Sequence, residues 1–206
     1  MEIARLQFIT NKKKKEDILE EAEAFMKGGG RWIQLRMKNA PEEEIEEAGH
    51  AMRALCDRYG AIYIMNDSIG LAVKTGADGV HLGKNDGSTA DARLILGNKI
   101  IGRTCHTFED IIKYAGEGAD YIGLGALRAT ATKADIAGEL GFDGYRRIFE
   151  RLKGMAGIPP IVAIGGIKES DIKQLRETGL YGIAVSGFIG NSHDPAEITR
   201  KIFSLL

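Results

Sequence analysis

Polar side chains follow several short apolar runs in this 206-residue chain. One run ends in Gln34-Leu-Arg36-Met-Lys38, where alternate residues carry an amide and two cationic groups. Alternate side chains of an extended chain point to the same side, so Gln34 and Arg36 would share a face, and Lys38 would continue the row if the chain stays extended. Arginine binds oxyanions in a bidentate manner, so the row predicts a phosphate or diphosphate site. Pairing of Arg36 with helix carboxylates is the structural alternative.

Two acidic side chains follow the next pair of apolar runs. Asp67 comes directly after the run that ends at Asn66, and Asp86 comes shortly after Leu82. On neighbouring strands, two carboxylates at one rim repel each other unless something neutralises them. Mg²⁺ meets this requirement because it prefers hard oxygen ligands, commonly one or two carboxylates with phosphate oxygens and water. The alternative is that Asp67 caps a helix and Asp86 lies in a solvated turn.

Glycines follow the last two apolar runs. One run leads into Gly165-Gly166, and the other ends in Val185-Ser186-Gly187. Glycine lets backbone N–H groups approach an anion closely, and a helix that starts there adds the positive end of its dipole. These two segments therefore predict a second phosphate site.

A polar stretch rich in threonine separates the sixth apolar run from the next helical pattern. It spans residues 128–135 and includes Thr130, Thr132 and Lys133. A long loop beside an active site usually acts as a lid or a binding loop. Its hydroxyl and ammonium groups suit phosphate, and a poorly ordered loop is the alternative.

The chain repeats one unit, a short apolar run followed by an amphipathic charged stretch. The clearest helical patterns are Lys14–Lys27 and Pro41–Tyr59, in which charged and apolar residues occupy opposite faces. Ile and Val dominate the apolar runs, as expected of parallel strands covered on both faces. The eight strand candidates are Arg5–Thr10, Arg31–Leu35, Ala61–Asn66, Gly79–Leu82, Lys99–Thr104, Tyr121–Gly125, Pro160–Ile164 and Gly182–Ser186.

Strict alternation of strand and helix requires a parallel sheet with right-handed crossovers. Eight units favour a closed (β/α)8 barrel, or TIM barrel, as one domain over residues 1–206, because closure removes the sheet edges. An open doubly wound sheet is the alternative, although no GxGxxG motif follows the first strand to support dinucleotide binding. In a barrel the carboxyl ends of all strands face the active site, so the polar residues above would share one mouth.

Caps, histidines and cysteines complete the pattern. We expect helix caps at Asp67, Ser88, Thr107, Glu169–Ser170 and Ser192. The alternation places His81 inside the barrel, either lining the pocket or packed and hydrogen-bonded, and the role of His106 stays open. Cys56 and Cys105 form no CxxC motif and are expected to be reduced structural thiols.

Composition excludes several classes of function. The net charge of −1 gives no basic surplus for nucleic acid or an anionic membrane. No apolar run approaches the roughly 20 residues of a membrane span, and the charged N-terminus does not fit a secretory signal. We therefore expect a cytoplasmic protein whose partners are small phosphorylated substrates, and a homo-oligomer is possible.

In this order the motifs closely resemble those of thiamine-phosphate synthases, over nearly the whole chain. The matching segments are Gln34–Lys38, Ile64–Asp67, Gly76–Gly83 with Asp86, Ile101-Gly with His106, Gly118–Gly123, Thr130–Lys133, Val162–Ile167 and Ala184–Ser186. The resemblance implies a (β/α)8 enzyme that joins hydroxymethylpyrimidine diphosphate to thiazole phosphate and releases pyrophosphate. It also implies a dissociative mechanism in which Mg²⁺ and cationic residues assist the departing diphosphate.

Residue roles carry over by position from this resemblance. Thr104 stands where the family usually has a serine that contacts the diphosphate. The implied metal ligands are Asp67 and Asp86. The implied ligands of the pyrimidine diphosphate are Gln34, Arg36, Lys38, Asn66, Thr104 and Lys133, of which Arg36, Lys38, Thr104 and Lys133 would act in catalysis. The implied ligands of the thiazole phosphate are Thr130, Thr132, Gly166, Val185 and Ser186.

The chain also departs from the family pattern. Lys84 replaces a common glutamine, and Ala126, Arg128 and Ala129 replace a pattern of proline and aromatic residues. We expect Arg128 either to strengthen anion binding or to face solvent.

Three alternatives to synthase activity remain. A thiazole tautomerase of the same fold looks to carry a histidine where this chain has Ala126 and to lack the pair Asn66-Asp67, which favours the synthase. Another phosphate-binding barrel isomerase or aldolase would not need paired metal carboxylates. A catalytically silent barrel would not need the polar rim.

Overall fold

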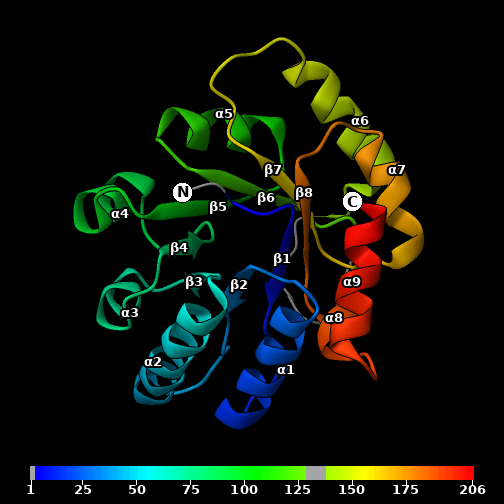
Figure 1. Ribbon diagram of the computed structural model, residues 1–206. Helices are drawn as coiled ribbons and strands as arrows, with labels where there is room; N and C mark the ends of the chain where they lie inside the picture. Colours follow the sequence, from blue (N-terminus) through cyan, green and yellow to red (C-terminus); the bar gives the residue numbers. More distant parts are fainter. Residues whose placement is uncertain (1–2, 129–137) are drawn as a thin grey trace.

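The computed structural model describes residues 3–128 and 138–206, in which short strands alternate with helices (Figure 1). The strands are β1 Leu6–Ile9, β2 Trp32–Leu35, β3 Ile62–Asn66, β4 Gly79–Leu82, β5 Ile100–Cys105, β6 Tyr121–Gly125, β7 Ile161–Ile164 and β8 Gly182–Val185. The helices are α1 Lys15–Lys27, α2 Glu42–Tyr59, α3 Ile69–Lys74, α4 Thr89–Leu96, α5 Phe108–Gly116, α6 Gly141–Leu152, the 3₁₀ turn η1 Glu169–Asp171, α7 Ile172–Arg176, α8 Gly187–Gly190 and α9 Pro195–Leu205.

The strands form a closed parallel barrel in sequence order. Closure is made by β1 and β8, where Leu6 pairs with Ile183 and Phe8 with Val185. The predicted (β/α)8 barrel is therefore confirmed and the open sheet excluded. Each predicted strand is present with its ends correct to within one residue, because burial on both faces gives each strand a sharply bounded apolar run.

Two layers of apolar side chains stabilise the barrel. The larger core lies between the strands and the surrounding helices and includes Phe8, Ile33 and Tyr145. A smaller cluster fills the barrel interior around Trp32 and Tyr121, whose rings meet edge to face at 4.8 Å. Because side chains alternate along a strand, the second cluster identifies which residues point inward on every strand except β4, which contributes none to it.

Helix caps show where the local sequence rules succeed and fail. Ser88 and Thr107 cap α4 and α5 as predicted, each accepting a 3.0 Å bond from a backbone N–H of the first turn. Asp67 does not cap α3, because Ser68 accepts from Leu71 N instead. Asp67 has a φ of 64°, whereas a cap residue needs extended backbone.

The other two predicted caps are also wrong. Asp194, not Ser192, caps α9 by accepting from Glu197 N at 2.8 Å. The turn that begins at Glu169 is closed by the Asp171 carboxylate, which accepts from Lys168 N at 2.8 Å. In both places the capping carboxylate lies one to two residues beyond the predicted position.

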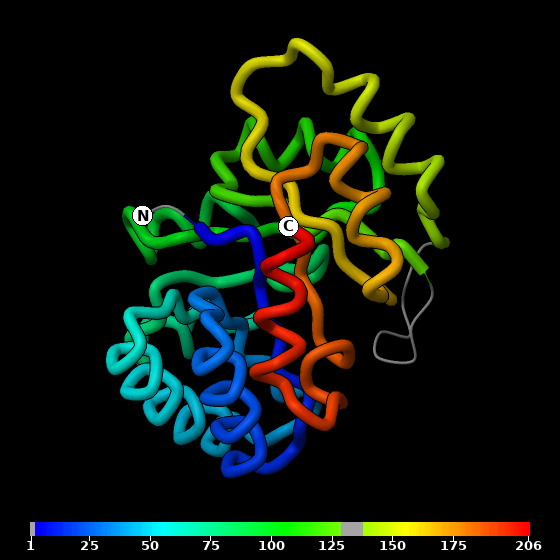
Figure 2. The backbone as a smooth tube through the Cα atoms, turned by 45° about the vertical axis from the view of Figure 1, so that its right-hand side comes forward, coloured from blue at the N-terminus to red at the C-terminus, as the bar shows by residue number. Residues whose placement is uncertain are grey.

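The last helix completes the outer ring. Helix α9 lies beside α1, as Figure 2 shows, and a methyl group on Gly28 would come within 2.5 Å of the Ala196 carbonyl oxygen. Glycine at this position therefore permits the close approach of the two helices. Within the described ranges, no helix combines the length and the apolar character that crossing a bilayer requires.

Candidate active site

The carboxyl end of β2 brings the predicted anion-binding residues to the barrel mouth. Gln34 points inward and is buried, and its Nε2 donates to Gln7 Oε1 at 3.4 Å. Arg36 follows on the same side and is half-buried. The buried Thr10 hydroxyl accepts from Arg36 N at 2.9 Å and donates to Arg36 O, which fixes the backbone of Arg36 against the end of β1.

Lys38 does not continue this row. The strand ends at Leu35, and the chain turns at Lys38 and Asn39, where Asn39 has a φ of 65°. Lys38 is exposed on the same rim, in a turn. The extended backbone on which the expectation for Lys38 depended is absent there, so Lys38 leaves the row but stays on the same rim.

Asp67 and Asp86 come together as the sequence predicts. Asp67 N donates to His81 O at 2.8 Å, which ties the ends of β3 and β4. Asp86 Oδ2 accepts from Gly83 N at 2.7 Å. The pKa of Asp67 is raised to about 6, first by partial burial and then by repulsion from Asp86 and a hydrogen bond between the two carboxyls. Asn66 and Arg36 lower the pKa of Asp67 and so oppose this shift.

This donor set fits a hard divalent cation. Two carboxyls share one small region, and the Arg36 guanidinium is close enough to act on the pKa of Asp67. Among the described residues no group of three or more His, Cys, Asp or Glu side chains gathers in a way that suits a metal. Mg²⁺ commonly binds one or two carboxylates and completes its shell with water and phosphate oxygens, so a pair of acids is sufficient.

The two histidines near the rim are both hydrogen-bonded. His81 is buried, with Nδ1 2.8 Å from Tyr121 Oη and Nε2 2.9 Å from Thr104 Oγ1. The packed and hydrogen-bonded alternative for His81 is therefore correct. His106 bonds through Nδ1 to the Gly125 carbonyl and so links the ends of β5 and β6.

The turns after β7 and β8 have the backbone expected of an anion site. Gly165 and Gly166 have φ values of 91° and 67°, a conformation that favours glycine. Val185 ends β8, and Ser186 directly precedes the short helix α8, where its carbonyl accepts from Ile189 N and Gly190 N. The first N–H groups of a helix have no partner inside it, and here they lie at the mouth of the barrel.

Arg128 has a role that neither expectation anticipated. Its guanidinium forms a two-pronged ion pair with Asp171, with Nη2 2.8 Å from Oδ1, and donates to Gly166 O at 3.1 Å. The hydrogen bonds from Arg128 lower the pKa of Asp171. Arg128 therefore joins the ends of β6 and β7, so simple solvent exposure does not describe it, and its expected part in anion binding stays a prediction.

Thr130, Thr132 and Lys133, predicted to bind the substrates, lie outside the described residues 3–128 and 138–206. The described residues that the structure does bring to one rim are Gln34, Arg36, Lys38, Asn66, Asp67, Asp86, Thr104, Gly166, Val185 and Ser186.

The sequence analysis missed three polar residues that hold the site. Gln7 and Tyr121 point into the barrel and bond to each other, and Thr10 clamps Arg36. Their inward direction follows from strand alternation, so that signal was present in the sequence. Their partners lie on strands distant in the chain, and only barrel closure reveals those contacts.

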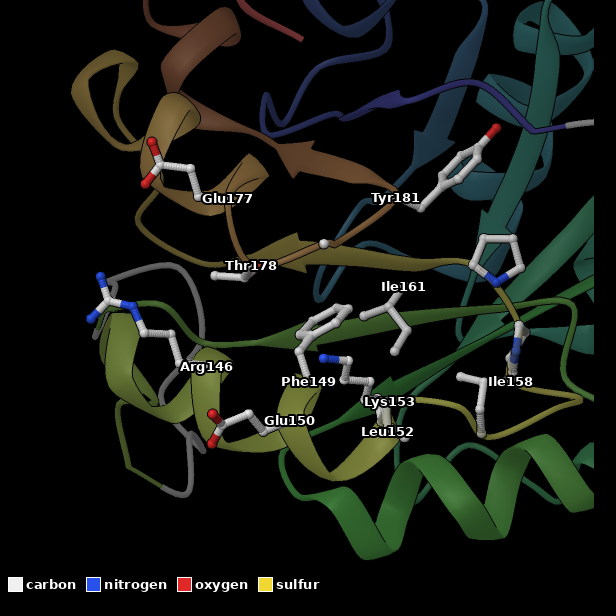
Figure 3. A pocket seen from close by; sticks show the side chains of 13 residues that line it. Arg146, Phe149, Glu150, Leu152, Lys153, Ile158, Ile161, Glu177, Thr178 and Tyr181 are labelled. Atoms are coloured by element: carbon white, nitrogen blue, oxygen red, sulfur yellow. The ribbon is translucent and has the colours of Figure 1, made fainter.

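A separate groove of about 600 Å³ lies at the opposite end of the barrel (Figure 3). Phe149, Ile158 and Tyr181 line it, near the start of β7 and β8. No predicted rim residue in the described part of the chain lines this groove. Active sites of such barrels lie at the carboxyl ends of the strands, so we place the candidate site at the polar rim.

The structure is a closed (β/α)8 barrel whose cations, paired acids and glycine turns lie at the carboxyl ends of the strands. These features are those of a (β/α)8-barrel enzyme. A family model described as thiamine monophosphate synthase matches residues 6–189. The chain belongs to this family, whose named members are enzymes of thiamine biosynthesis.

Curated relatives and a solved structure match this chain over nearly its full length. Thiamine-phosphate synthases of Phocaeicola vulgatus and Bacteroides thetaiotaomicron are 46% and 45% identical over 201 residues, which is 97% of this chain and 97% and 96% of theirs. Thiamine phosphate pyrophosphorylase from Pyrococcus furiosus superposes with a TM-score of 0.84 at 32% identity, over 98% of this chain and 94% of that one. The predicted family is thus confirmed.

Proposed function

We propose that the enzyme joins 4-amino-5-hydroxymethyl-2-methylpyrimidine diphosphate to 4-methyl-5-(2-phosphoethyl)thiazole, giving thiamine phosphate and pyrophosphate. The observation that carries this proposal is the contact between the Asp67 and Asp86 carboxyls, with Arg36 close enough to act on the pKa of Asp67. Loss of a diphosphate requires ligands for a divalent cation and positively charged side chains that neutralise the leaving group. The rim of β2, β3 and β4 supplies both kinds of group.

Asp67 and Asp86 would hold Mg²⁺, which when bound neutralises charge on the diphosphate. The Arg36 guanidinium, which is close enough to act on the pKa of Asp67, would bind two oxygens of the leaving group, and Lys38 and Lys133 would add positive charge. Stabilising this charge is the largest expected contribution to catalysis. The remaining proposed ligands are Gln34, Asn66 and Thr104 for the pyrimidine diphosphate, and Thr130, Thr132, Gly166, Val185 and Ser186 for the thiazole phosphate.

Pyrophosphate release tests the reaction directly. We expect release only when Mg²⁺ and both substrates are present, since attack by the thiazole nitrogen completes the reaction. Chelation of the metal should abolish it. Pyrophosphate release that does not depend on the thiazole phosphate would contradict the proposal and indicate simple hydrolysis.

The role of the acids is tested by Asp67→Asn. We expect kcat/KM for pyrophosphate release to fall by about 10²- to 10³-fold, because the amide gives the cation one neutral oxygen in place of a carboxylate. Asp143→Asn, on the exposed surface of α6, is the matched control and should retain full activity. Equal activity of the two variants would remove Asp67 from the proposed metal site.

A further inference from the structure

Five buried polar side chains form one continuous file across the barrel interior. Gln34 Nε2 donates to Gln7 Oε1 at 3.4 Å, and Gln7 Nε2 donates to Tyr121 Oη at 3.1 Å. Tyr121 Oη is 2.8 Å from His81 Nδ1, and His81 Nε2 is 2.9 Å from Thr104 Oγ1. The file therefore joins Gln34 and Thr104, two proposed ligands of the diphosphate substrate on different strands.

One assignment of the hydrogens lets every donor along this file point in the same direction, from Gln34 toward Thr104. The Gln7 amide nitrogen donates to the Tyr121 oxygen, which leaves the phenol proton available for His81 Nδ1. Burial raises the pKa of Tyr121, so the phenol keeps that proton. With Nδ1 as the acceptor, the neutral imidazole carries its hydrogen on Nε2 and donates it to the Thr104 oxygen.

This direction leaves the Thr104 hydroxyl proton to point away from His81. A hydroxyl has one donor and two acceptor positions, and His81 occupies an acceptor position. Thr104 is the most exposed member of the file at 8%, whereas Tyr121 is at 0%. The Thr104 hydroxyl hydrogen is therefore the one that no other member of the file accepts, and it lies at the least buried end of the file, near the carboxyl end of β5.

Two glycines make room for the rings that carry the file. A methyl group on Gly102 would lie 2.1 Å from Tyr121 Cζ, and one on Gly123 would lie 3.1 Å from His81 Cε1. Trp32 packs edge to face on Tyr121 from the other side. The phenol and imidazole are thus confined by rigid neighbours, which is the condition for a fixed hydrogen-bond direction.

We propose that Tyr121 and His81 are positioning residues that fix the Thr104 hydroxyl as a hydrogen-bond donor to an anionic oxygen in the barrel mouth. The anion is a diphosphate oxygen, and this identity rests on the proposed function. The donor is set before substrate arrives, so no rotation is needed when negative charge grows on the leaving group. Gln7 and Gln34 anchor the far end of the file.

The tautomer of His81 tests the direction without any substrate. In ¹⁵N NMR of the free enzyme at neutral pH, we expect His81 to carry hydrogen on Nε2 alone. Tyr121→Phe removes the proton given to Nδ1 and should shift His81 toward the Nδ1–H tautomer. Tyr145→Phe, which removes another buried phenol outside the barrel, is the matched control and should leave His81 unchanged. A wild-type Nδ1–H or doubly protonated ring would overturn the proposal.

A double-mutant cycle tests whether Tyr121 acts through Thr104. We expect Tyr121→Phe to lower kcat/KM for pyrophosphate release about tenfold in the wild-type background, the effect of weakening one hydrogen bond to a charged group. In the Thr104→Val background the same change should cost less than about twofold, because the donor is already absent. Thr104→Ser keeps the hydroxyl and should retain most of the activity.

Additive losses in this cycle would show that Tyr121 does not act through Thr104 and would sink the proposal. The NMR measurement is independent of the test of the overall reaction, because the tautomer of His81 is measured without turnover. A wild-type enzyme that releases no pyrophosphate would refute the proposed function while leaving the tautomer measurement valid.

Discussion

Glu21 is a single carboxyl buried where α1 meets the ends of β1 and β8. It is 4% exposed, and burial raises its pKa to about 7, against backbone N–H groups of Asn11 and Lys12 that oppose the shift. Glu21 Oε2 and Asn11 Oδ1 are buried and have no hydrogen-bond partner among the described residues. A methyl group on Gly190 would lie 2.6 Å from both oxygens, so they face the same small space. A proton on Glu21 Oε2 would satisfy both.

This arrangement predicts the pH dependence of stability at one residue. Because the folded-state pKa of Glu21 is above its ordinary value, the stabilisation is complete below about pH 4.5 and is lost as the pH rises through about 7. Glu21→Gln keeps a neutral hydrogen-bonding group at every pH. We expect this variant to unfold with nearly wild-type free energy at pH 5 and to gain about 1–3 kcal/mol over wild type at pH 8.

Urea unfolding at the two pH values measures the difference. Glu20→Gln, an exposed neighbour on α1, is the control and should change stability equally little at both. A Glu21→Gln variant that is destabilised at pH 8 would show that the carboxylate is needed in its charged form.

Sequence reasoning at the residue scale succeeded where strand geometry applies. Gln34 and Arg36 were placed correctly because the period of two holds to the end of β2. Lys38 leaves the row because Asn39 adopts a left-handed conformation, and Asn39 itself was the signal, since asparagine takes that conformation more readily than most residues. The role of Arg128 could not be predicted, since Asp171 is 43 residues away and meets it only in the folded barrel.

At the scale of elements, β5 and β6 depend on a fit between a glycine and a ring. Gly102 on β5 lies beside Tyr121 on β6 in the strand register, and any Cβ at position 102 would overlap the phenol. Tyr121 cannot move aside, because Trp32 and the buried file of hydrogen bonds hold it. Strand glycines of this kind mark a close approach of a side chain rather than a turn.

Gly102→Ala should therefore lower the free energy of unfolding by about 1–3 kcal/mol or more, the usual cost of overpacking a core. Thermal or urea unfolding measures this loss, and His81 tautomer NMR should report a disturbed ring. Gly116→Ala is the matched control, because that glycine ends α5 with nothing within 4 Å of an added methyl group. Equal stability of the two variants would mean that the barrel interior has room for the methyl group.

Strands were easier to predict than helix starts for a physical reason. A strand buried on both faces ends where its apolar run ends, so the bounds follow from composition. A helix starts where a cap residue meets extended backbone, and several polar residues compete for that position. Ser68 competes successfully with Asp67 because Asp67 is held by its bond to His81 O and takes a left-handed φ.

For the whole molecule, closure of the barrel decides which residues meet. The contact between Asp67 and Asp86 was predictable, because β3 and β4 are consecutive and consecutive parallel strands are neighbours. The file from Gln34 to Thr104 was not predictable, because Gln7 and Tyr121 lie on β1 and β6, which are not neighbours in the barrel. They meet only because the closed barrel is narrow enough for side chains to cross it.

Closure also makes the proposed metal site a property of the whole fold, since unfolding separates Asp67 from Asp86. A ligand that binds only the folded state raises stability by mass action. At a Mg²⁺ concentration ten times its dissociation constant, we expect the melting temperature to rise by about 3–5 °C over the chelated protein. Asp67→Asn should lose this rise, whereas Asp143→Asn should keep it. Calorimetry with the metal alone measures the effect without substrates, and an equal rise in both variants would place the cation elsewhere on the protein.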